Sequence, residues 1–197
     1  MMLASKTSSM TRIASNSPPP VTLSEEDMDE LKEVIVEFLS LNKYLYHRRV
    51  QKYVFAGEIW SAQETGHRLT DASFCPYNYG PYSKAVEQAL EELTDEERIS
   101  CESSYGKNKY ETDEQGGELS PRKKFVVKQV WEEYKGVPTE DVIRDVKDSW
   151  VYENYKQCEE IDFAKYIDEY VRPPEGEDIP EEKNPISIEE TAEILTT

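Results

Sequence analysis

The strongest constraint on the fold is a run of apolar residues with helical spacing near the amino end of the chain. Thr22 and Glu25 just before it have the spacing of a capping box, which predicts a helix from about residue 23 to about residue 41. Such a helix persists in water only when its apolar face packs against other elements. The chain must therefore build a core from several helices. The residues at positions i, i+3, i+4, i+7 and i+8 are Leu31, Val34, Ile35, Phe38 and Leu39.

Further segments carry helical spacing or residues typical of helix ends. Between residues 98 and 113, alternating side chains on both sides of "YGKN" predict a β-hairpin. The expected fold class is mainly α: a compact helical domain with one small β-hairpin. The additional helices are expected at residues 44–66, with Gly66 as C-cap, at 82–93, at 120–136, from 139 onward and at 162–171.

Composition limits the folded domain to part of the 197 residues, because only 37% of them are hydrophobic. Residues 1–21 are rich in Ser and Thr and contain three consecutive prolines, so we expect a disordered leader there. Residues 172–197 form an acidic tail rich in Pro and Glu, in which "SIEETAEILTT" predicts a short helical motif. The helical domain is expected to span residues 22–171.

The formal net charge of −18 restricts the partners of the chain. Such acidity repels phosphate backbones and anionic lipid surfaces, which argues against nucleic acid and membrane partners. Two origins remain open: adaptation to a salt-rich cytoplasm, or a partner protein that is itself basic. No run approaches the length of a membrane span, and the start of the chain lacks the apolar segment of a signal peptide. We expect a soluble, cytoplasmic protein.

The chain shows no constellation typical of catalysis, metal binding or cofactor binding. Cys75, Cys101 and Cys158 are odd in number and far apart, so they indicate neither a disulfide framework nor a zinc site. The only histidines, His47 and His67, belong to no metal-binding motif and stand beside no motif of a nucleophile. Glycine-rich phosphate loops are absent as well. We expect a protein that is not an enzyme and has no metal and no cofactor.

The stretch "FCPYNYGPYSKAVEQALEEL" from Phe74 to Leu93 is the most unusual part of the sequence. Gly80 permits a backbone conformation closed to other residues, and Pro81 fixes the entry to the following helix. The aromatic rings of this stretch have two readings. They wedge the loop onto the preceding helix near Trp60, or they form a contact surface for a protein partner. The candidate partner-binding residues are Trp60, Tyr77, Tyr79, Pro81 and Tyr82.

Together with its neighbours, this stretch resembles the Panacea domain, the SocA-like antitoxin family. The family shows a helix with a Leu/Val-Gln-Lys-aromatic core, a Gly-Arg-Pro-Leu-like turn and a Tyr-Gly-Pro motif that opens another helix. The turn of this chain reads "GHRL" and departs from the family at its central positions. The resemblance covers residues 30–115, and residues 120–171 fit as the family's variable helical continuation. The matching motif residues are Val50, Gln51, Lys52, Tyr53, Gly66, Leu69, Tyr79, Gly80 and Pro81.

The resemblance implies a function without catalysis. Panacea domains occur in bacterial, archaeal and phage toxin–antitoxin modules, where they neutralise varied toxins by protein–protein contact. One branch acts as a proteolytic adaptor that delivers a toxin to a protease. The expected partners are therefore a cognate protein toxin, whose basic charge would complement this acidic chain, and in the adaptor branch a protease. The alternative is a winged-helix-like DNA-binding regulator, because a helix at 82–93 is followed by a hairpin whose tip carries Lys107, Asn108 and Lys109.

Overall fold

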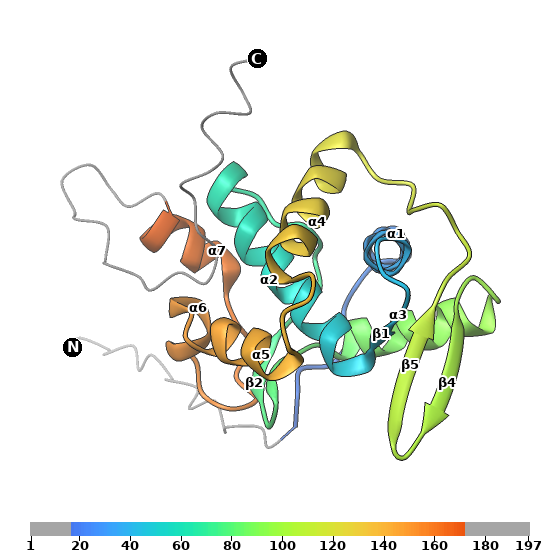
Figure 1. Ribbon diagram of the computed structural model, residues 1–197. Coiled ribbons are helices and arrows are strands. Elements are labelled where there is room, and N and C mark those ends of the chain that lie inside the picture. Colours follow the sequence, from blue (N-terminus) through green and yellow to red (C-terminus); the bar gives the residue numbers. More distant parts are fainter. Residues whose placement is uncertain (1–16, 172–197) are drawn as a thin grey trace, which may run out of the picture.

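A computed structural model describes residues 17–171 of the chain. The predicted leader (1–21) therefore lies mostly outside the described residues, and the predicted tail with its helical motif (172–197) lies outside them entirely. The described part is mainly helical (Figure 1), which confirms the expected fold class. Its helices are α1 (Glu25–Ser40), α2 (His47–Thr65), α3 (Lys84–Asp95), α4 (Pro121–Tyr134), α5 (Thr139–Lys147), α6 (Trp150–Glu153) and α7 (Phe163–Tyr166), followed by the π-helical turn η1 (Ile167–Val171).

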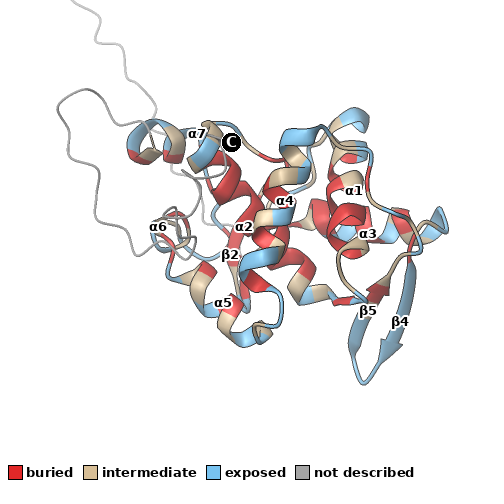
Figure 2. Cartoon of the chain, turned by 45° about the horizontal axis from the view of Figure 1, so that its top comes forward, coloured by how far each residue is buried: buried red, intermediate tan, exposed pale blue. Residues whose placement is uncertain are grey.

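Helix α2 is the centre of the core. Its residues from Val50 to Ala62 are all buried, and α1, α4 and α5 pack around it (Figure 2). The predicted end is confirmed, since Gly66 caps the helix with a left-handed φ of 64° and donates its N–H to Ala62. The predicted start at residue 44 is wrong. Leu45 and Tyr46 are extended and pair with the hairpin, so the helix begins only at residue 47.

The cap of α1 lies two residues later than the sequence pattern suggests. Ser24 is the N-cap, and its side chain accepts the N–H of Asp27, whose carboxylate in turn receives the N–H of Ser24. The spacing of Thr22 and Glu25 is the same, but Thr22 lies in extended chain before the helix. Of two overlapping boxes, the one next to the first helical residue acts as the cap.

Two small antiparallel sheets accompany the helices. The predicted hairpin is confirmed. Its second strand also pairs with a short strand at residues 45–46, which the sequence did not suggest. The second hairpin was missed because both of its strands contain a proline, which normally argues against a strand. The first sheet has the order β1 (Leu45–Tyr46), β5 (Lys107–Glu111), β4 (Ser100–Ser104), and the second pairs β2 (Cys75–Tyr77) with β3 (Gly80–Tyr82).

The turn after α2 is held by a buried carboxylate. Glu58 is fully buried and accepts the backbone N–H groups of Leu69 and Thr70, the hydroxyl of Thr70 and the guanidinium of Arg68. Leu69 fits closely against Gly57, where an added Cβ would lie 2.6 Å from the Leu69 side chain. This network fixes the "GHRL" turn and sends the chain back along α2 toward the second hairpin.

Candidate protein-contact site

Helix α2 holds the β2–β3 hairpin through two polar side chains, Gln51 and Lys52. The Gln51 amide accepts the N–H of Ser83 at 2.9 Å and donates to the Ser83 carbonyl at 3.0 Å, so it pairs with the backbone as a neighbouring strand would. The Lys52 ammonium donates to the carbonyl of Pro81 at 2.6 Å. Both side chains are buried. Their place in the motif is therefore explained by a structural role, since they fix the entry to α3.

Lys52 is unusual because it is buried without an ion pair among the described residues. Only 3% of the residue is exposed, and burial lowers the pKa of its amine to about 7, with Lys147 and Arg48 adding repulsion. A neutral amine still donates a hydrogen bond, so the contact to the hairpin persists in either protonation state. The third residue of this motif, Tyr53, stacks on Tyr134 inside the core.

Gly80 is needed at the start of β3. Its φ is +96°, a region that L-residues rarely adopt, and an added Cβ would lie 3.0 Å from Cε of Lys52. We expect Gly80→Val to cost on the order of 1–3 kcal/mol, a fall in melting temperature of roughly 2–4 °C per kcal/mol. Gly136→Val is the comparison, because Gly136 has a φ of +77° but no neighbour near its Cβ position, so this variant carries the backbone strain without the contact with Lys52 and should lose less stability than Gly80→Val. An unchanged melting temperature of the Gly80 variant would contradict this assignment.

The three tyrosines of the hairpin lie in different environments. Tyr77 and Tyr82 pack against each other with ring centroids 5.3 Å apart, and the Tyr82 hydroxyl donates to Glu87. Burial, followed by this carboxylate, raises the pKa of Tyr82. Tyr79 stands in the two-residue turn between the strands and is 57% exposed. Of the three, only Tyr79 is thus largely exposed.

The hairpin is also held by segments other than α2. Tyr152 of α6 donates its hydroxyl to the Tyr77 carbonyl, and Gln157 donates to the side chain of Asn78. The backbone N–H of Cys158 bonds the carbonyl of Pro76 at 2.8 Å. Contacts from three segments leave the turn little freedom, so Tyr79 is presented in a fixed position.

Arg48 is the residue of this candidate site that sequence reasoning missed. Its guanidinium carbon lies 3.8 Å from the centroid of the Tyr79 ring, a cation–π contact. Arg48 is exposed and makes no ion pair within the described residues. A signal was present: Arg48 and Lys52 stand four residues apart and therefore share the face of α2 that meets the hairpin. Tyr and Arg are the side chains most often found at binding hot spots.

Two candidates named from the sequence do not belong to this surface. Trp60 is 4% exposed and packs against Phe125 of α4. It lies eight residues beyond Lys52, about 12 Å farther along α2, so the hairpin does not wedge against it. Pro81 lies within β3 and is buried, and its carbonyl accepts a hydrogen bond from Lys52. Both residues support the core and cannot contact a partner directly in this conformation.

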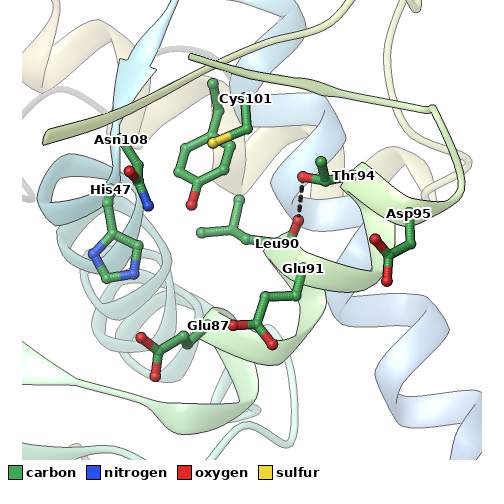
Figure 3. A pocket seen from close by; sticks show the side chains of 9 residues that line it. His47, Glu87, Leu90, Glu91, Thr94, Asp95, Cys101 and Asn108 are labelled. Atoms are coloured by element: carbon green, nitrogen blue, oxygen red, sulfur yellow. Dashed lines mark hydrogen bonds between the residues drawn. The ribbon is translucent and has the colours of Figure 1, made fainter. Parts of the chain in front are cut away.

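A surface hollow of about 440 Å³ lies between α3 and the β4–β5 hairpin (Figure 3). Leu90 and Tyr110 line it, and His47 reaches it from the start of α2. Three carboxylates of α3, those of Glu87, Glu91 and Asp95, follow one another at four-residue intervals along its wall. The wall formed by α3 is therefore strongly acidic.

The two histidines belong to no metal-binding cluster in the described residues, and neither is hydrogen-bonded to a thiol, although His47 and Cys101 line the same hollow. Burial lowers the pKa of His47, and its Nε2 is buried without a hydrogen-bond partner. His67 is exposed in the turn after α2. Residues 17–171 contain no group of three or more side chains that could hold a metal ion. No described helix combines the length and the apolar character that crossing a membrane requires.

Comparison with known families gives one match. The family model described as "Antitoxin SocA-like, Panacea domain" matches residues 50–151, slightly more than half of the chain. The matched segment runs from the first turn of α2 into α6 and includes both hairpins. Arg48 lies two residues before it. Neither a curated protein nor a solved structure matches the chain.

Proposed function

Because this chain belongs to the SocA-like antitoxin family with its Panacea domain, we propose that it binds and neutralises a protein toxin through protein–protein contact, without catalysis. The family implies a cognate toxin as partner. The net charge of −18 favours a toxin that is basic overall. The same contact would serve a proteolytic adaptor, which binds the toxin and brings it to a protease in the cytoplasm.

The observation that carries this proposal is the exposed Tyr79 ring on Arg48. Tyr79 is 57% exposed, and its ring lies against Arg48 in a cation–π contact, so the free protein leaves an amphipathic aromatic side chain open to a partner. The surrounding hairpin is nevertheless held by Gln51, Lys52 and Tyr152. A rigid support beneath an exposed Tyr and Arg is the arrangement of a pre-organised contact surface.

A binding role also agrees with the surroundings of the potential catalytic groups. Burial raises the pKa of the Cys75 thiol to about 12, which removes its nucleophilic form at neutral pH. Cys101 is exposed on β4, and no described histidine is hydrogen-bonded to either thiol. These features support a protein without a catalytic centre of the nucleophile–base kind.

The proposal is tested by co-expressing the chain with the toxic product of an adjacent gene and measuring growth and complex formation. We expect Tyr79→Ala to weaken the complex by about tenfold or more, about 1.4 kcal/mol, with the melting temperature unchanged. Tyr79→Phe keeps the ring and should bind as the wild type does. Failure of the wild-type chain to bind the toxin and restore growth would refute the proposed function.

The alternative of a winged-helix-like DNA-binding regulator has one observation in its favour. Helix α3 is followed directly by the β4–β5 hairpin, and β1 completes a sheet beside β5, as a recognition helix and wing would require (Figure 1). The electrostatics oppose it. Glu87, Glu91 and Asp95 line the face of α3 next to the hairpin, where they would repel phosphates. Retention on heparin with a steep salt dependence would favour this alternative.

A further inference from the structure

The described residues expose a small number of large apolar side chains. They are four tyrosines: Tyr44, Tyr46, Tyr79 and Tyr105. Tyr44 lies just before β1 and Tyr46 lies in it, and their ring centroids are 5.6 Å apart. Tyr79 contacts α2 through the cation–π contact with Arg48. Single exposed apolar residues are ordinary, whereas neighbouring exposed rings, such as those of Tyr44 and Tyr46, are typical of an interaction surface.

Tyr105 is the most informative of the four. It stands at the tip of the β4–β5 hairpin with a φ of +49°, a conformation that favours Gly or Asn, and it is fully exposed. An aromatic residue there raises the energy of the turn, and its exposed ring adds little contact within the chain to offset that cost. A strained backbone that contributes nothing to stability is a reason to look for a function.

A small pocket connects the hairpin tip to the Tyr79 region. It encloses about 230 Å³ and is lined by Tyr46, Arg48, Lys107 and Glu140, with Gly106 at the tip of the hairpin. Arg48 and Lys107 make no ion pair with Glu140 or with any other described residue. Two cations without an ion-pair partner, and one carboxylate, that of Glu140, thus border a pocket whose wall includes the Tyr46 ring, in a chain that is acidic overall.

We propose that the tyrosine surface, formed by Tyr46, Arg48, Tyr79, Tyr105 and Lys107, binds a short acidic segment of a protein partner. Carboxylates of the segment pair with Arg48 and Lys107, and its apolar side chains pack on the tyrosine rings. The inference rests on the proposed function and specifies the partner at that site. A toxin that is basic overall would present an acidic segment at this contact.

The neighbouring hollow limits the length and the class of the occupant. It shares His47 and Asn108 with the pocket, and α3 lines it with Glu87, which lies close to His47, and with Glu91 (Figure 3). A long polyanion such as a nucleic acid strand would meet these carboxylates as it left the pocket, whereas a peptide with two or three acidic residues would not. The charges around the pocket therefore favour a short acidic peptide.

The test is a titration of the full-length, ¹⁵N-labelled chain, followed by amide chemical shifts. The probe is the capped peptide Gly-Asp-Tyr-Glu-Gly, and its neutral counterpart is Gly-Asn-Tyr-Gln-Gly. We expect shifts at residues 46–48 and 105–108 and an affinity about tenfold higher for the acidic peptide. A twelve-nucleotide oligothymidine is titrated in parallel as the polyanion.

Three variants separate binding from folding. Arg48→Gln and Lys107→Gln should each weaken binding of the acidic peptide about fivefold or more, whereas Lys128→Gln, at an exposed lysine of α4, should not change it. Tyr105→Asn relieves the strained turn. It should therefore keep or raise the melting temperature while it weakens peptide binding, a combination that a merely structural role for Tyr105 would not produce.

Equal binding of the acidic and neutral peptides, or unchanged binding by both cation variants, would overturn the inference. Shifts caused by the oligonucleotide and not by the peptide would overturn it in favour of nucleic acid. Neither result bears on toxin neutralisation, which is measured by growth and complex formation. A chain that neutralises its toxin but ignores the acidic peptide would leave the proposed function standing and remove only this inference.

Discussion

Replacement of Glu58 by alanine is expected to destabilise the folded chain by about 3–5 kcal/mol. The carboxylate is fully buried and receives four donors, two of them the backbone N–H groups of Leu69 and Thr70 at 3.0 and 3.1 Å. Without it, these buried N–H groups lose their partners and Arg68 loses its counter-ion. Each unsatisfied buried donor costs about 1–3 kcal/mol, so the loss is a large fraction of the roughly 5–15 kcal/mol by which a typical domain is stable.

The measurement is urea unfolding of the wild type, Glu58→Ala and a matched control. Glu64→Ala is suited to that role, because Glu64 is exposed and lies between one and two turns farther along the same helix. The control should stay within about 0.5 kcal/mol of the wild type. A Glu58→Ala protein that is as stable as the control would show that the "GHRL" turn does not depend on this carboxylate.

The network around Glu58 shows what the sequence could and could not predict. The start of the turn could be predicted from the sequence, because Gly66 is a typical C-cap and ends an apolar helical pattern. The acidic residue that holds the turn could not be predicted, because the chain has 41 acidic residues and nothing in the local pattern separates Glu58 from the rest. Its role arises from a contact ten to twelve residues away along the chain, which only the folded structure defines.

One part of the candidate site could be predicted from the sequence, and the part that depends on contacts between distant segments could not. Composition singled out the stretch around Tyr79 and Gly80, and the need of Gly80 for a left-handed φ followed from the glycine itself. The hairpin around it was hidden by Pro76 and Pro81, which face each other in the pair and need no ladder hydrogen bond there. Arg48 looked like one charge among many at a helix start, because its contact with Tyr79 joins segments about thirty residues apart.

Lys52 should make the stability of the protein increase with pH between 7 and 9. The pKa of the folded-state amine is about 7, against about 10.5 for an exposed lysine, chiefly because of burial. In this range the unfolded chain binds the proton and the folded chain releases it, so stability rises with pH at up to about 1.4 kcal/mol per unit. Below pH 7 the amine is charged in both states, and the cost of burying that charge is present in full.

The test compares urea unfolding of the wild type and Lys52→Met at pH 7 and pH 9. Between these values the wild type should gain about 2 kcal/mol relative to the variant, which has no amine to titrate. The comparison removes the opposing contribution of Cys75, whose raised pKa lowers stability as the unfolded thiol ionises near pH 9.

Lys128→Met, at an exposed lysine, should follow the wild type. If Lys52→Met showed the same pH dependence as the wild type, Lys52 would have to remain charged in the folded protein, and a buried ammonium bonded only to the Pro81 carbonyl would require a counter-ion or water beside it.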